Sequence, residues 1–401
     1  MSIAPRASLV FCLSIFLSLP ALLPAQVATP APAAAAPATP ADAAPLTSPS
    51  MSGPLTSAAP NTFEVGPFGK LAVNGILSGF GYWQNNPLSV DQGAMADISN
   101  GQIFVQKPTG IVQFYVQAGA YNLPALGAPF LSTADTISGF FGPLPQAYVK
   151  IALKGPFSFQ AGKLPTLIGA EYTFTFENAN IERGLLWNQE NAVNRGVQLN
   201  YAGKKLAASL SWNDGFYSNR WNWLFGSATY TFNAANNIIF VAGGNLGNTN
   251  YSTLATPAAQ NNSSIYNVIY THTGKNWMFQ PYFQFTHLSE HPLIGVFRTT
   301  STQGEAVLGT YTLPHHMTVA GRFEFISSTG NADEGSANLL YGPGSNAVSI
   351  TATPTYQNKA FFTRGELSFV HAGNSTAGDV FGPHGTDTSQ VRGVVEAGFL
   401  F

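Results

Sequence analysis

The sequence has few charged residues and almost no cysteine. Only 17 basic and 19 acidic residues occur among 401, whereas a soluble domain of this length with about 25% charge would carry roughly 100. The near balance of the two signs provides no cationic surface for polyanions, which argues against nucleic-acid binding. The single cysteine, Cys12, lies near the N-terminus. The rest of the chain therefore has no residues for a disulfide or a zinc–thiolate site.

Long apolar runs are also scarce. One follows Arg6 and runs from Ala7 to Leu23, with the small residue Ala25 as the expected cleavage point, which predicts a secretory signal peptide over 1–25. After it, no uninterrupted apolar stretch is long enough for a transmembrane helix. Residues 26–62 contain 12 Ala and 8 Pro with one charge, Asp42. Such a composition buries too little apolar surface to fold, which predicts a disordered periplasmic linker over 26–62 and a folded domain over 63–401.

The folded domain shows an apolar residue at every second position. Phe157, Phe159 and Ala161, for example, alternate with Ser158 and Gln160. This period predicts strands with one apolar and one polar face, a pattern that also occurs in soluble antiparallel sandwiches. Sixteen strands are expected, over 68–83, 98–106, 111–121, 145–154, 156–165, 193–202, 205–213, 224–233, 237–246, 263–273, 276–288, 302–313, 315–327, 346–356, 359–371 and 390–401.

The connections between these strands favour a transmembrane barrel over a sandwich. Seven tight turns alternate with eight long connections, which is typical of outer-membrane β-barrels with short periplasmic turns and long extracellular loops. Because every backbone amide must be paired in hydrocarbon, the antiparallel sheet is expected to close on itself. The last strand places Val395, Phe399 and Phe401 on one face. This ending resembles the C-terminal insertion signal of bacterial outer-membrane barrels, carried here by Phe399 and Phe401.

The few charged residues within the strands fall mainly on the polar face. A charge facing lipid near the middle of the bilayer costs about 2 to 4 kcal/mol, which assigns these side chains to the lumen. If the last two strands pair, Arg364 approaches Glu396 and Glu366 approaches Arg392. A wide lumen with so few charges predicts an aqueous channel for small hydrophilic solutes that are neutral or weakly charged. The lumen-facing charges are Lys150, Arg322, Glu324, Arg364, Glu366, Arg392 and Glu396.

Several short motifs resemble a known family. QAYVKI at 146–151 and AGKLPTLIGAE at 161–171, followed by NRGVQLNY at 194–201 and GKKLAASLSWNDGF at 203–216, resemble the OmpL-like β-barrel porin-2 family of outer-membrane proteins. The resemblance covers most of 63–401. It implies an outer-membrane channel for small hydrophilic solutes, with no catalytic residues and no cofactor.

Residues 166–192 form the longest connection. In general porins the loop in this position folds inward and narrows the pore. By that resemblance, Glu171, Glu177, Glu182 and Glu190, with Arg183 in the same loop, are candidates for a pore constriction. The four glutamates would face Lys150, Arg322, Arg364 or Arg392 across it. The alternative is an outward loop that covers the barrel mouth or forms a subunit contact.

Other functions are less well supported by the sequence. An enzyme would need a histidine close to a nucleophile or to acids at one strand end, and no such arrangement is indicated. The HLSEH stretch at 287–291 would direct its two histidines apart at a strand end, so no metal site is expected. The alternative to a porin is a non-conducting barrel that acts in adhesion or binding through its loops. Expected partners are outer-membrane lipid, lipopolysaccharide, the barrel-assembly machinery and, by analogy with general porins, two further copies in a homotrimer.

Overall fold

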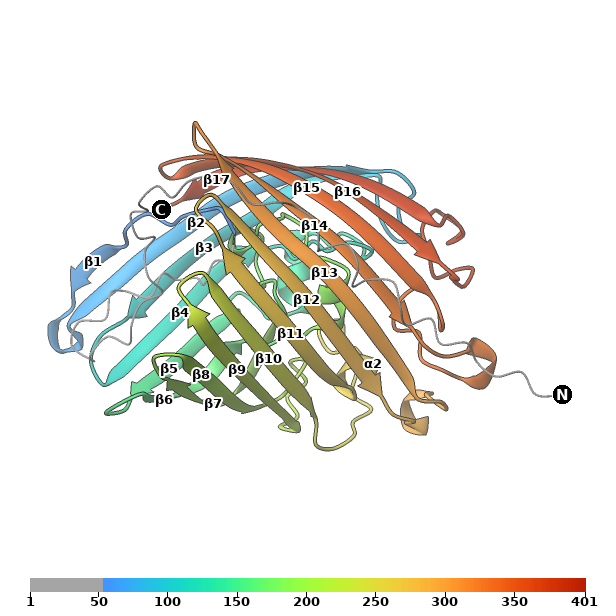
Figure 1. Cartoon of the computed structure of the whole chain (residues 1–401), viewed down its shortest axis with the longest axis horizontal. Coiled ribbons are helices and arrows are strands. Elements are labelled where there is room, and N and C mark those ends of the chain that lie inside the picture. The colour runs from blue at the N-terminus through green and yellow to red at the C-terminus, as the bar shows by residue number, and fades with distance from the viewer. Residues whose placement is uncertain (1–52) are drawn as a thin grey trace, which may run out of the picture. The chain divides into compact units, whose positions relative to one another are not determined.

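The computed structural model describes residues 53–401. The predicted signal peptide and residues 26–52 of the predicted linker lie outside the described residues. Sixteen antiparallel strands follow one another around a closed barrel (Figure 1). They are β2 (Lys70–Gln84), β3 (Ala94–Lys107), β4 (Val112–Tyr121), β5 (Gln146–Ala152), β6 (Phe157–Pro165), β7 (Val193–Ala202), β8 (Leu206–Asn213), β9 (Trp223–Asn233), β10 (Asn236–Asn245), β11 (Ser264–Thr273), β12 (Trp277–Leu288), β13 (Thr300–Leu313), β14 (Met317–Ser328), β15 (Asn346–Asn358), β16 (Phe361–Gly373) and β17 (Ser389–Leu400).

The number, order and type of these strands confirm the predicted barrel. Strand β17 pairs with β2, and this pairing closes the sheet. At the seam, the Phe401 amide donates to the Gly75 carbonyl at 2.9 Å and the Gly75 amide donates to the Phe401 carbonyl at 2.6 Å. The last residue of the chain therefore completes the ladder on which a lipid-embedded sheet depends.

The predicted inside and outside faces are also confirmed. On β4, Val112 is exposed on the outer face, whereas Gln113 and Gln117 are buried on the inner face. Phe399 and Phe401 at the chain end are exposed on the outer face. The barrel therefore presents apolar side chains to its surroundings and polar ones to its lumen, as a bilayer requires.

A short seventeenth strand, β1 (Asn61–Glu64), was not predicted. It pairs with residues 70–73 of β2, beyond the point where β17 ends opposite Ile76. β1 thus covers an edge of β2 that would otherwise be left unpaired. The predicted disordered linker over 26–62 is therefore too long at its C-terminal end, because residues 53–62 contact the barrel. The alternating polarity of 61–64 is too short to reveal a strand.

The long connections carry the remaining secondary structure. The helices are α1 (Thr133–Gly139) and α2 (Ala258–Asn261), and the 3-10 turns are η1 (Gly66–Phe68), η2 (Thr175–Glu177), η3 (Leu186–Gln189), η4 (Pro292–Ile294) and η5 (Ala332–Glu334). Within residues 53–401, no helix has the length and apolarity needed to cross a membrane. All eight connections at one end of the barrel are long, and the seven at the other end are short.

Candidate functional site

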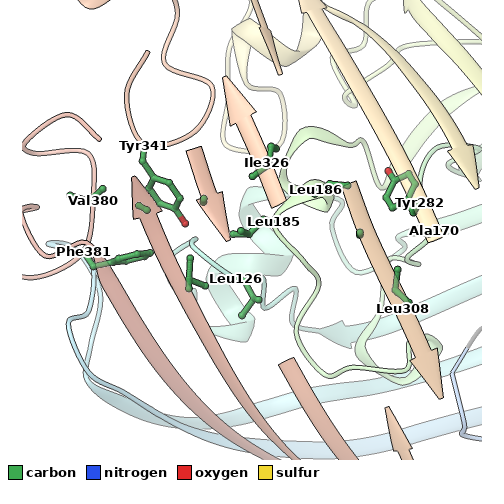
Figure 2. Close-up of a cluster of buried hydrophobic side chains, with 14 of the residues drawn as sticks. Leu126, Ala170, Leu185, Leu186, Tyr282, Leu308, Ile326, Tyr341, Val380 and Phe381 are labelled. Atoms are coloured by element: carbon green, nitrogen blue, oxygen red, sulfur yellow. The ribbon is translucent and has the colours of Figure 1, made fainter. Parts of the chain in front are cut away.

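The structure places residues 166–192, here called the inward loop, inside the barrel. Nearly all side chains from Thr173 to Leu186 are buried. Leu185 and Leu186 pack against wall residues that include Ile326 and Leu308 (Figure 2). The expected inward fold is therefore what the structure shows, and the outward alternative is not.

Arg322 of β14 is one point of attachment for the inward loop. Its guanidinium donates to Glu171 Oε1 at 2.6 Å and to the Glu182 carbonyl at 2.8 Å, and it lies 3.2 Å from Glu324. All of these groups are buried. Charge-assisted hydrogen bonds of this kind are about twice as strong as neutral ones, so Arg322 holds both limbs of the loop against the wall.

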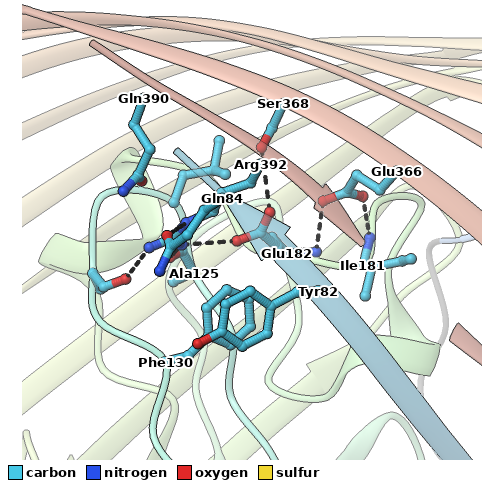
Figure 3. Close-up of polar contacts among 12 residues, drawn as sticks. Tyr82, Gln84, Ala125, Phe130, Ile181, Glu182, Glu366, Ser368, Gln390 and Arg392 are labelled. Atoms are coloured by element: carbon cyan, nitrogen blue, oxygen red, sulfur yellow. Dashed lines mark hydrogen bonds and ion pairs between the residues drawn. The ribbon is translucent and has the colours of Figure 1, made fainter. Parts of the chain in front are cut away.

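Arg392 of β17 is a second point of attachment. It donates to Glu182 Oε1 at 2.9 Å, to the Gln84 side chain at 2.7 Å and to the Ala125 carbonyl at 2.8 Å (Figure 3). Asp91 lies 3.6 Å away. One guanidinium thus joins the barrel wall, the inward loop and the connection between β4 and β5.

Two wall glutamates accept hydrogen bonds from the loop backbone. Glu366 accepts from the Ile181 amide and from the Glu182 amide at 3.0 Å (Figure 3). Glu324 accepts from the Leu185 and Leu186 amides at 3.0 and 3.2 Å. Buried amides need acceptors, and these carboxylates provide them. This role had no signal in the sequence, because backbone donors are the same at every residue.

The predicted pairing of the last two strands is right for one charge pair and wrong for the other. Arg364 lies opposite Glu396 in the register and forms an ion pair with it. Glu366 lies opposite Val394, and Ser368 lies opposite Arg392. Arg392 therefore pairs with the inward loop, which the two-strand register did not include.

The other predicted constriction residues, Glu177, Glu190 and Arg183, have contacts of different kinds. The Glu177 carboxylate accepts from the Phe174 amide at 2.8 Å. Burial raises the pKa of Glu177 to about 8, although the Phe174 amide and the Arg183 charge both lower it. Glu190 accepts from the Tyr282 hydroxyl. Arg183 lies over the Trp187 ring at 4.8 Å, and its side-chain nitrogens have no hydrogen-bond acceptor among the described residues.

Lys150 was expected to face the loop glutamates, and this expectation is wrong. It lies on β5, opposite Gln113 and Gln160 of the neighbouring strands, and it forms no hydrogen bond or ion pair with the inward loop among the described residues. Two of the loop acids, Glu171 and Glu182, instead bind Arg322 and Arg392 directly.

The lumen consequently has two different walls. The loop-covered wall comprises β12–β17 with β2 and β3, where Arg322, Arg364, Arg392 and their carboxylate partners are buried. The water-accessible wall is the half of β5–β10 that lies nearer the short turns. Several of its inward side chains are polar and only half-buried, although Gln198 and Val241 beside them are buried. The half-buried polar residues are Lys150, Gln160, Ser209, Ser227, Thr229 and Asn237.

Residues 53–57 also lie inside the barrel, on the periplasmic side. Leu55 is only 2% exposed and packs in a cluster with Phe104, Phe362 and Leu400. The Gly53 amide donates to the Glu177 carbonyl at 3.1 Å. The chain before β1 therefore reaches the periplasmic side of the inward loop.

Comparison with known proteins agrees with this geometry. The family model described as "Putative beta-barrel porin-2, OmpL-like" matches residues 70–401. The chain belongs to this family. Its members are outer-membrane β-barrel porins, a class of channels that is generally non-enzymatic. No curated protein matches the chain.

Solved structures show the same fold at low identity. The outer-membrane channel DcaP of Acinetobacter baumannii is 9% identical, with a TM-score of 0.57 over 84% of this chain and 99% of its own. The trimer form of OmpT from Vibrio cholerae is 10% identical, with a TM-score of 0.53 over 82% and 99%. Salmonella typhi OmpF in complex with daunomycin is 14% identical, with a TM-score of 0.53 over 84% and 100%.

Proposed function

We propose that this porin-2 family member lets small hydrophilic solutes, neutral or weakly charged, cross the outer membrane by passive diffusion. The observation that carries the proposal is the unequal lumen, in which the inward loop is bound to one wall and leaves the other polar and accessible to water. Glu171 and Glu182, held by Arg322 and Arg392, then set the width of the passage and do not move with the solute.

Planar-bilayer recording and liposome swelling test this proposal. The full-length protein in bilayers should give steady conductance steps, and neutral sugars should enter liposomes at rates that fall with their size. Amino acids of similar size and opposite charge should enter at rates within a few-fold of each other. An absence of steps and of swelling would contradict a diffusion channel.

A non-conducting barrel that binds or adheres through its loops is the second candidate. The observation in its favour is the extent of apolar packing inside the barrel, where Leu55 and the inward loop fill space from opposite ends. In this case bilayers would show no steps, while the purified protein would still bind a surface or a partner through the extracellular loops.

The same proposal includes the route to the membrane and the assembly. Residues 1–25 act as the signal peptide and residues 26–52 form a periplasmic linker. The barrel-assembly machinery recognises Phe399 and Phe401. The protein contacts lipopolysaccharide in the outer leaflet and forms homotrimers, a state named for OmpT of Vibrio cholerae. Removal of the two terminal phenylalanine side chains should reduce the amount of folded barrel, measured by its heat-modifiable mobility on gels.

A further inference from the structure

A cavity of about 230 Å³ lies at the extracellular end of the barrel. Four long connections surround it, those that follow β4, β6, β8 and β10. These connections rise above the same strands that carry the water-accessible wall. A solute that enters the barrel on this side therefore meets the cavity before it meets the polar wall.

The lining of the cavity is mainly apolar and aromatic. Trp187 from the inward loop and Phe140 and Phe216 from two other connections supply rings, and Leu254 closes one side. A Cβ built at Gly139 would lie 2.7 Å from Leu254, so the missing side chain lets the two connections touch. Such surfaces bind the flat face of a ring.

The polar lining groups present mostly acceptors. The side-chain amide of Asn122 donates to the Leu131 carbonyl and to the Thr133 hydroxyl, and that of Asn188 donates to the Leu126 carbonyl. Their side-chain oxygens accept no hydrogen bond from any residue that the structure describes. Glu190 also lines the cavity, but its Oε2 is enclosed by protein and burial raises the pKa of its carboxyl well above the ordinary value. The two asparagine oxygens are therefore the free acceptors, and a matching ligand must donate hydrogen bonds to them.

We propose that this cavity is a solute-binding subsite for neutral single-ring organic molecules that carry hydroxyl donors. The volume supports one ring, because a cavity of about 150 Å³ holds benzene and drug-sized ligands need about 300 Å³ or more. The mainly apolar lining disfavours charged solutes, because no accessible group of opposite charge would balance an ammonium or a carboxylate there. The inference rests on the proposed porin function, since it names the class of solute that the channel concentrates at its entrance.

Binding to the full-length protein in detergent tests the proposal without any need for conduction. Three probes share a phenyl ring and a two-carbon side chain: 2-phenylethanol, phenethylamine and phenylacetate. Isothermal titration calorimetry should show binding of 2-phenylethanol, with phenethylamine and phenylacetate each at least tenfold weaker. Equal affinities for all three, or tightest binding of either charged probe, would overturn the proposal, as would no binding at millimolar concentration.

Variants then locate the site. Ala255→Trp fills the cavity and should weaken 2-phenylethanol binding at least tenfold, whereas Leu246→Trp, 68% exposed on the same connection and outside the lining, should leave it unchanged. Leu254→Asp, at a position 53% exposed, is a second lining variant less demanding on the fold. Wild-type affinity in both lining variants would place binding elsewhere and overturn the subsite.

The two proposals fail in distinguishable ways. Binding without conductance steps would remove the porin function and keep the subsite. Conductance steps without binding would keep the porin and remove the subsite.

Discussion

The two walls of the lumen differ in how their polar and charged side chains are stabilised. On the loop-covered wall, Arg322, Arg364 and Arg392 are desolvated and their charges are balanced by carboxylates in direct contact. On the water-accessible wall, Lys150 and its neighbours remain solvated. A buried charge is tolerated only with a close partner, whereas a solvated charge needs none. Stability should therefore depend on the first wall and ion selectivity on the second.

The strongest test of this difference is to remove one buried cation. Arg322→Ala leaves Glu171 and Glu324 buried without their partner, which should cost about 3 to 5 kcal/mol of unfolding free energy. Release of the loop should also raise single-channel conductance several-fold. Denaturant unfolding in detergent and bilayer recording measure the two effects. Lys150→Ala is the matched control and should change stability by less than about 0.5 kcal/mol. Similar losses in both variants would mean that the walls are not different.

The second test concerns the periplasmic side of the inward loop. Leu55→Ala should cost about 2 kcal/mol, the low end for a buried leucine, because residues 53–57 can detach while the barrel persists. Leu77, 57% exposed on the outer face of β2, is the control, and Leu77→Ala in detergent should have little effect. Thermal unfolding compares the pair. If Leu55→Ala is as stable as Leu77→Ala, the segment does not support the loop.

The third test concerns selectivity on the water-accessible wall. Lys150 lies opposite Gln160 in the register. Lys150→Gln and Gln160→Glu each change the local charge by one, so both should shift the reversal potential toward cations by similar amounts. Lys150→Glu should shift it about twice as far. Unchanged potentials would show that ions do not pass this wall.

The smallest expected effect is a pH dependence of loop docking. The pKa of Glu177 is raised from 4.5 to about 8, so its neutral form is favoured in the docked loop. Its contribution to docking is complete below pH 4.5 and is lost as the pH rises through about 8. The frequency of large-conductance openings should therefore increase between about pH 5 and pH 8. Glu177→Gln keeps an acceptor for the Phe174 amide and should make this increase less steep. An equally steep increase in the variant would assign the pH dependence to other groups.

Which side chains meet inside the barrel was only partly predictable. Arg364 and Glu396 follow from antiparallel pairing of consecutive strands, so the sequence was sufficient. Arg392 and Glu182 are separated by 210 residues and meet because the inward loop crosses the lumen. Leu55 lies in a segment whose composition indicates disorder, and its burial depends on an apolar cluster contributed by several strands.

The sequence by itself determined the sixteen strands of the barrel, their inner and outer faces, the two kinds of connection and the placement of the arginines of β14, β16 and β17 in the lumen. These properties arise from a period of two and from the cost of a charge in lipid, which act on each strand separately. Only the tertiary structure decided where the inward loop binds, which carboxylate each arginine meets and that the lumen has two unlike walls. Those outcomes depend on backbone donors and on contacts between distant segments, which exist only once the barrel has closed.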